Sequence, residues 1–342
     1  MSLHRVFGVE LPVIQAPMAG VQDSALAIAV CAAGGLGSLP CAMFDAAAVA
    51  REVAAIRAAT SAPFNLNFFC HRPPVVDAGR EAAWRRALAP YHREFGIDID
   101  AVPAGPGRMP FDEATAAIVE AMRPPVVSFH FGLPEPALLA RVRASGARIV
   151  SSATTVDEAI WLEQHGVDAI IAQGLEAGGH RGHFLADDIS LQCGTFALLP
   201  QIVAAVRTPV IAAGGIADRA GVEAALRLGA SMVQLGTAYL CCREATTSRV
   251  HRAALTSAAA RHTALTRLIT GRPARGIVNR LMREVDDAAA PAFPLATAAI
   301  GPLRAAAEAR GSGDFSPLWC GQNASSCREA PAGEVTRELA GV

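Results

Sequence analysis

Short apolar segments alternate with alanine-rich stretches along most of this chain, and this alternation restricts its possible folds more than any other feature. The segments are brief and almost continuously apolar, which is typical of parallel strands covered on both faces. Eight are predicted as strands: Val13–Pro17, Leu36–Leu39, Phe64–Phe68, Val126–Phe129, Arg148–Ser151, Asp168–Ala172, Val210–Ala213 and Ser231–Leu235. Eight strands, each followed by a helix or an insertion, indicate a (β/α)₈ barrel. An open doubly wound sheet is the alternative, but no GxGxxG motif follows the first strand.

The stretches between the strands carry helix caps. The helix predicted over 24–33 ends at Gly34-Gly35, and Asp45 is placed to cap the helix predicted over 45–59. Further helices are predicted over 135–144, 155–164, 198–206 and 219–228. These helices would form the outer layer of the barrel.

Two parts of the chain interrupt the alternation. Residues 71–125 are rich in proline and hold helical pieces at 81–89 and 111–122, without a clear strand. After Thr237 no strand is evident. Helices are predicted there over 244–268, 279–283 and 303–310. The polar C-terminal tail is expected to be loose.

We therefore predict an α/β protein, a (β/α)₈ TIM barrel with a smaller helical substrate-binding domain. The barrel would comprise residues 1–72, 124–243 and 312–342. Residues 73–123 and 244–311 would form the helical domain that covers the substrate.

The amino-acid composition restricts the range of possible functions. The chain has 342 residues, 52% of them hydrophobic, so it can bury a large core. Its formal net charge of −1 argues against a nucleic-acid partner. No apolar run reaches the roughly 18 residues of a membrane span, and the N-terminus lacks a signal peptide, so we expect a cytoplasmic protein. The eight cysteines are irregularly spaced and are expected to be reduced.

The chain contains no lysine. A Schiff-base mechanism needs a lysine amine, so lysine-dependent aldolases and pyridoxal-phosphate enzymes are excluded. The lysine of a phosphate-binding P-loop is missing as well.

Two histidines close predicted strands or follow them. His180 ends the glycine-bearing loop after Asp168–Ala172, and His130 closes the fourth strand in the sequence SFHFG. Barrel enzymes keep their chemistry at the C-terminal ends of strands, so the two imidazoles would converge on one mouth. Each could instead be a buried histidine bonded to backbone. His183 adds a conceivable metal pair, but no acidic cluster supports it and we expect no metal.

Two glycine turns follow the seventh and eighth strands, at Gly214-Gly215 and Gly236-Thr237. In barrels the loops after these strands commonly bind a phosphate, although turn glycines also occur in every α/β protein. Gly178 and Gly179 lack a Cβ, so a flat group could lie against that backbone. The carboxamides of Gln15, Asn67 and Gln173 suit the edge of a pyrimidine-like ring, which the apolar loop Ala16–Gly20 could cover.

These segments resemble the blocks of the nitronate monooxygenase family, formerly called 2-nitropropane dioxygenases. The matching blocks are VIQAPMAG at 13–20, FNLNFF at 64–69, SFHFGLP at 128–134, AQGLEAGGHRG at 172–182, PVIAAGGI at 209–216, QLGTAYL at 234–240 and DFSPLWCGQNA at 314–324. The AQGxEAGGHxG and IAAGGI blocks are shared with flavin-dependent enoyl-ACP reductases and NADH:quinone reductases. SFHFG and LWxGQ are more specific to nitronate monooxygenases.

The resemblance implies FMN across the barrel mouth. The cofactor-binding residues would be Ala16, Pro17, Met18, Asn67, Gln173, Gly178, Gly179, Gly214, Gly215, Gln234, Gly236 and Thr237. His130 and His180 would be the catalytic residues on the substrate side, where an imidazolium could bind an anion.

The family reaction oxidises an alkyl nitronate with O₂ to a carbonyl compound and nitrite. The implied partners are a small nitronate or nitroalkane and O₂, with a possible homodimer. The alternative is an NAD(P)H-dependent FMN reductase of the enoyl-ACP reductase or quinone reductase type. Phe293 and Gly301 stand where this branch tends to have a tyrosine and a lysine, so the substrate pocket is expected to be less polar.

Overall fold

All eight predicted strands form one parallel sheet in the computed structural model, which describes residues 6–103 and 108–342. Residues 1–5 and 104–107, included in the predicted barrel and helical ranges, lie outside the described part. The strands are β1 (Val13–Gln15), β2 (Gly37–Pro40), β3 (Phe64–Phe69), β4 (Val126–His130), β5 (Arg148–Ala153), β6 (Ala169–Gln173), β8 (Val210–Ala213) and β9 (Met232–Leu235). Their order is β1-β9-β8-β6-β5-β4-β3-β2, and a parallel bridge from Ile14 to Leu36 joins the two edges. The prediction of a (β/α)₈ barrel is confirmed.

Along most strands the side chains alternate between two apolar clusters, which explains the continuous apolar runs; in β3 the inner positions are instead the buried Asn65 and Asn67. Val126, Val150 and Ile171 belong to the cluster inside the barrel. Their neighbours Val127 and Ile170 belong to the cluster between strands and helices. Both faces of every strand are therefore removed from water.

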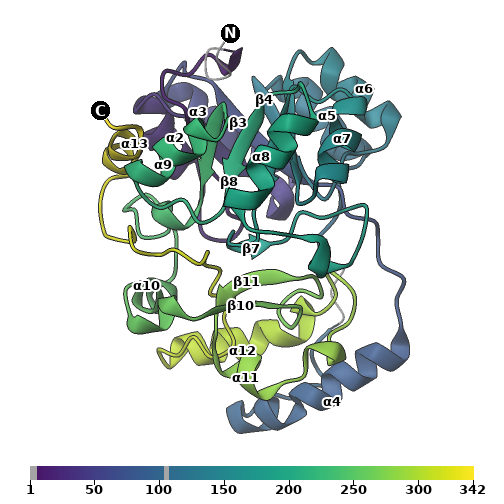
Figure 1. Cartoon of the computed structure of the whole chain (residues 1–342). Coiled ribbons are helices and arrows are strands. Elements are labelled where there is room, and N and C mark those ends of the chain that lie inside the picture. Colours follow the sequence, from purple (N-terminus) through teal and green to yellow (C-terminus); the bar gives the residue numbers. More distant parts are fainter. Residues whose placement is uncertain (1–5, 104–107) are drawn as a thin grey trace.

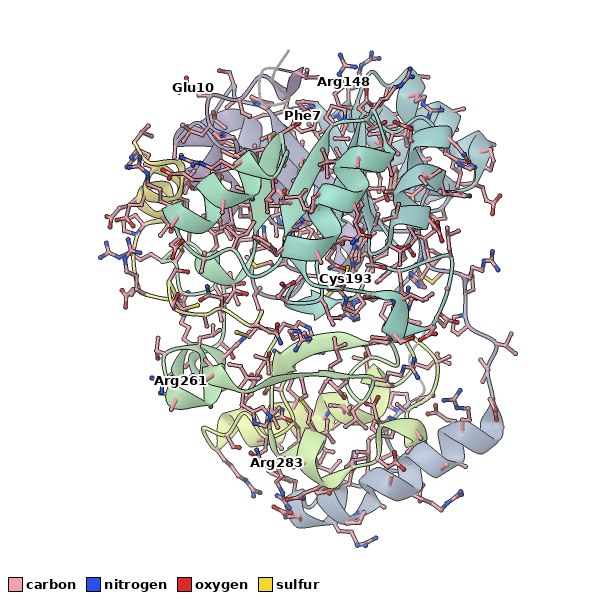
Figure 2. All side chains as sticks on the ribbon, in the orientation of Figure 1. Phe7, Glu10, Arg148, Cys193, Arg261 and Arg283 are labelled. Atoms are coloured by element: carbon pink, nitrogen blue, oxygen red, sulfur yellow. The ribbon has the colours of Figure 1, made fainter. Side chains whose placement is uncertain are left out.

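The C-terminal ends of the strands point toward a second, smaller region. Figure 2 shows Phe7 and Arg148, which begins β5, at one end of the molecule, and Arg261 and Arg283 at the other. Phe7 packs with the inner cluster and covers the N-terminal end of the barrel. The opposite end, where the predicted site lies, faces the second region (Figure 1).

The outer layer contains predicted helices and one helix that was not predicted. The predicted ones are α2 (Ser24–Ala32), α3 (Ala46–Ala59), α5 (Glu113–Met122), α6 (Pro136–Ala144), α7 (Val156–Gln164), α8 (Thr195–Ala205) and α9 (Arg219–Arg227), and the unpredicted one is α13 (Ala332–Ala340). Asp45 caps α3 as predicted, because its carboxylate accepts a hydrogen bond from the Ala48 N–H at 2.8 Å. In the described residues, no helix is both long and apolar enough to cross a membrane.

The prediction of a helix over 244–268 is wrong. Only α10 (Arg249–Leu255) and a 3₁₀ turn, η4 (Ala258–Arg261), are helical there. The chain then forms β10 (Thr263–Thr266), which pairs antiparallel with β11 (Ala274–Ile277), and β11 pairs with the two-residue strand β7 (Gly179–His180). Such short strands carry too few residues for a period of two to stand out beside an alanine-rich stretch.

The insertion after β3 joins the second region. Its helix α4 (Ala78–Phe95) lies beside α12 (Thr297–Ala309), with α11 (Arg280–Glu284) nearby (Figure 1). Trp84 is fully buried there and donates from its indole N–H to the Ala296 carbonyl at 3.2 Å. This contact supports our proposal that residues of the insertion and of 244–311 form one covering domain. Helix α5, by contrast, packs on the barrel helices α3 and α6.

The C-terminal tail is folded, contrary to expectation. Helix α13 packs on α2 and α9 and buries Val335 and Leu339. Thr336 donates its hydroxyl proton to the Ala332 carbonyl at 2.8 Å, so the buried Tyr239 hydroxyl, 2.9 Å away, donates to Thr336. The tail is therefore tied to the segment that follows β9.

Replacing Tyr239 with phenylalanine tests this link. The variant Tyr239→Phe should lower the free energy of unfolding by about 1 kcal/mol, because one buried hydrogen bond is lost while the ring packing remains. Urea denaturation followed by circular dichroism measures the change. An unchanged unfolding free energy would mean that α13 is not held as described.

Candidate active site

A cavity at the C-terminal ends of the barrel strands gathers the predicted site residues. All twelve predicted cofactor-binding residues and both predicted catalytic histidines line it: Ala16, Pro17, Met18, Asn67, His130, Gln173, Gly178, Gly179, His180, Gly214, Gly215, Gln234, Gly236 and Thr237. They come from six strand ends and the loops that follow them. The barrel thus brings together residues that are up to 221 positions apart in the sequence.

The two glycine turns present unused donors. Gly214 and Gly215 have φ of 116° and 72°, which only glycine adopts freely. In the described part of the chain, the N–H groups of Gly214, Gly215 and Gly236 have no hydrogen-bond partner. The Thr237 hydroxyl oxygen accepts from the Gly321 N–H at 3.0 Å, so its proton remains available. Such a group of donors suits a phosphate.

Glycine is required at positions 178 and 179, just before His180, for different structural reasons. A Cβ on Gly178 would lie 2.6 Å from the Gly321 nitrogen, so the missing side chain lets the loop pack on the segment around Cys320. Gly179 has φ of 72°, and a Cβ there would meet nothing within 4 Å. Only Gly179 thus fits the predicted role of an open surface for a flat group.

His180 is held by the second region. It lies in β7, opposite Ala274 of β11, and its Nε2 lies 3.0 Å from the Thr270 hydroxyl. That hydroxyl can donate to the Arg272 carbonyl, 3.5 Å away, and then accepts the His180 Nε2–H. In this tautomer Nδ1 is an unprotonated acceptor. The His180 Nδ1 has no hydrogen-bond partner among the described residues.

His130 has both ring nitrogens engaged. Its Nε2 lies 3.3 Å from the His180 carbonyl oxygen, which can only accept, so Nε2 carries the proton. Its Nδ1 then accepts from the Ser152 hydroxyl at 2.6 Å. This network orients the His180 backbone and leaves the neutral His130 ring without a free nitrogen.

Neither histidine is an imidazolium, contrary to expectation. Burial, reinforced by the Arg272 charge, lowers the pKa of His130 to about 3. Burial, and next the nearby Arg108 charge, lowers the pKa of His180 well below its usual value. Both rings are therefore neutral near pH 7.

The three carboxamide side chains mainly form hydrogen bonds with other groups of the protein. Gln173 donates to the His180 carbonyl at 2.9 Å and accepts from the Gly182 N–H at 2.8 Å, so it braces the loop. Asn67 donates to Ser128, and its Oδ1 has no hydrogen-bond partner within residues 6–103 and 108–342. Gln15 is fully buried, bonded to Ser38 and Gln22, and does not line the cavity. The expectation that Gln15 borders a ring is wrong.

Several residues that shape the site were not predicted from the sequence. Ser152 and Thr270 fix the two histidines, and Trp319 lies 5.6 Å from the His180 ring. Arg181 is fully buried and donates to the Gln173 and Gly174 carbonyls at 2.8 and 2.7 Å. A basic residue inside a glycine loop was the available signal for Arg181. His183 does not line the cavity.

Comparison with known proteins decides the family. The sequence model described as nitronate monooxygenase matches residues 1–341. The chain is 43% identical to a nitronate monooxygenase of Paraburkholderia phytofirmans, covering 99% of this chain and 93% of that protein. It is also 43% identical to one of Pseudomonas aeruginosa, covering 98% and 97%. The chain belongs to the nitronate monooxygenase family. It is therefore an oxidoreductase.

The structure of a nitroalkane oxidase from Streptomyces ansochromogenes is similar to this nitronate monooxygenase family member over the whole fold. The TM-score is 0.89 and the identity is 38%, and the match covers 99% of this chain and 97% of that one. A mutant form of FabK from Thermotoga maritima is 25% identical with a TM-score of 0.71, covering 99% and 94%. The barrel and the covering region thus occur together in both proteins.

Buried neutral histidines predict a loss of stability in acid. His71, His183 and His251 are 5%, 2% and 3% exposed, and burial lowers their pKa values to about 4, 3 and 4. Because the unfolded histidines titrate near 6.5, their stabilisation is complete above that pH and is lost as the pH falls toward 4. Near pH 5.5 each should cost about 1 kcal/mol of unfolding free energy.

Urea denaturation near pH 7.5 and pH 5.5 measures this loss. His251→Gln should remove about 1 kcal/mol of the difference between the two pH values, whereas His262→Gln, at an exposed position, should leave the difference unchanged. Equal stability of the native chain at both pH values would contradict the neutral burial of these rings.

Proposed function

We propose that this protein is an FMN-dependent nitronate monooxygenase. It would oxidise alkyl nitronates with O₂ to carbonyl compounds and nitrite, with the flavin across the barrel mouth. Family membership supports the reaction class. The observation that carries the proposal is the meeting of the glycine donors and His180 in one cavity.

The residues present fit FMN. The free N–H groups of Gly214, Gly215 and Gly236, with the Thr237 hydroxyl, would hold its phosphate. The open backbone at Gly179 leaves room for the ring, and the unused Oδ1 of Asn67 offers it an acceptor. Bound FMN would supply the one-electron chemistry between the nitronate and O₂.

His180 is proposed to meet the substrate. Its Nδ1 is an unprotonated acceptor, held in place by Thr270 on the other ring nitrogen. A nitronate is already deprotonated and needs no base, whereas a neutral nitroalkane must lose a Cα proton, which Nδ1 can accept. His130 is proposed to act through its hydrogen bond to the His180 carbonyl, as a positioning residue.

The two substrate forms separate these roles. His180→Ala should lower kcat/KM for nitroethane by about a hundredfold or more, and by a smaller factor for ethyl nitronate. His262→Ala, at an exposed position, is the matched control and should change neither. Equal losses for the two substrates would show that His180 is not the base.

The pH profile gives a second readout of His180. A base with the usual histidine pKa would lose about tenfold in activity between pH 7.5 and 5.5. Because burial lowers the pKa of His180 well below its usual value, the native enzyme should keep its kcat/KM for nitroethane over that range. A decline with a midpoint near pH 6.5 would contradict the neutral assignment.

The visible spectrum tests the proposed function directly. Protein loaded with FMN should change its flavin absorbance when propionate 3-nitronate is added without oxygen, and NADPH should have no such effect. Bleaching by NADPH alone would move the protein to the NAD(P)H-dependent FMN reductases, which share two of its sequence blocks. A protein that takes up no FMN would refute both functions.

A further inference from the structure

Arg108 is a cation in the cavity that has no anionic partner among the described residues. It lines the cavity, and its Nε and Nη1 are buried without any hydrogen-bond partner in the described part of the chain. Its remaining donor reaches only the Met43 sulfur, at 3.8 Å. A guanidinium with buried nitrogens and no carboxylate is costly, so this arrangement points to a partner that arrives with the ligand.

The rest of the cavity lining cannot neutralise this charge. Among the described residues, Arg108 is the only arginine that lines the cavity, and no aspartate or glutamate lines it. His130, His180 and His251 also line it. The cavity is therefore electrostatically suited to an anion.

Arg108 lies close to the aromatic side chains around His180. Its guanidinium carbon lies 5.9 Å from the Phe293 ring centre, and its backbone carbonyl accepts from His71 at 3.0 Å. The Phe293 ring lies 5.4 Å from the His180 ring. The Met43 sulfur lies 3.8 Å from the Arg108 guanidinium, and Met43 is 55% exposed, so Arg108 lies near the surface of the protein.

We propose that Arg108 is a specificity-determining residue, which binds a second acidic group, such as a carboxylate, at the end of the nitronate's carbon chain. This inference rests on the proposed function, since it names the substrate class of the same cavity. Paired N–H groups of a guanidinium fit a carboxylate in a bidentate manner. A nitronate whose chain ends in a methyl group would leave those donors unsatisfied.

Substrate preference measures this role. The ratio of kcat/KM for propionate 3-nitronate to that for propyl 1-nitronate should fall about tenfold or more in Arg108→Met, which keeps an unbranched side chain but removes the guanidinium and its charge. The change should appear mainly in KM, because binding at a remote group is shared by ground and transition states. Arg108→Lys should recover part of the ratio.

Arg86→Met, an exposed arginine on α4, is the matched control and should keep the native ratio. An unchanged ratio in Arg108→Met, or an equal loss for both nitronates, would overturn the proposal. Either result would place Arg108 outside carboxylate recognition.

A binding measurement separates this inference from the proposed function. By equilibrium dialysis, the native protein loaded with FMN should bind 3-nitropropionate at least about tenfold more tightly than 1-nitropropane, and Arg108→Met should remove that difference. This holds even if neither nitronate is oxidised, which would refute only the proposed function. Equal affinities in the native protein would refute the role of Arg108.

Discussion

The pairing of β7 with β11 is the contact on which the site depends. Two residues of a barrel loop, Gly179 and His180, form a ladder with Ala274 and Arg275 of the second region. Thr270, in the turn before β11, then holds the His180 ring. The barrel alone would leave His180 on a mobile loop, because loops gain their order from the elements that brace them. The covering region therefore fixes the imidazole as well as enclosing the cavity.

The barrel was predictable because its signal repeats. Each strand is a short apolar run with both faces buried, and all eight were located to within two residues. The cavity followed from the same regularity, since strand ends must meet at one mouth. The strands β10 and β11 were not predictable, because β11 draws its stability from pairing with distant residues such as His180. Arg108 was hidden as well, since nothing in the sequence distinguishes a buried arginine within the proline-rich insertion.

Hydrogen bonds at the ring nitrogens determine what each histidine can do. His130 donates from Nε2–H to the His180 carbonyl and accepts from the Ser152 hydroxyl at Nδ1, so its tautomer is fixed and both nitrogens are engaged. In the tautomer described above, His180 donates from Nε2–H to the Thr270 hydroxyl, and its Nδ1 has no partner in the described part of the chain. Both histidines line the cavity, yet in the described part of the chain only His180 keeps a ring nitrogen without a hydrogen-bond partner. The difference arises from their partners, Ser152 and Thr270, which are distant in the chain.

The long cationic side chains near the cavity are all arginines, because the chain contains no lysine. Arg181 and Arg272 lie close to the histidines, and although burial lowers their pKa values to about 10, both stay charged near pH 7. An amine in the same surroundings starts from a pKa near 10.4 and could lose its proton on burial. Burial, reinforced by the guanidinium charges of Arg272 and Arg108, keeps His130 and His180 neutral. The partner-free Nδ1 of His180 is then an acceptor, while Arg108 is the group proposed to attract an anion. Under the proposed function, proton transfer and charge recognition therefore belong to different residues.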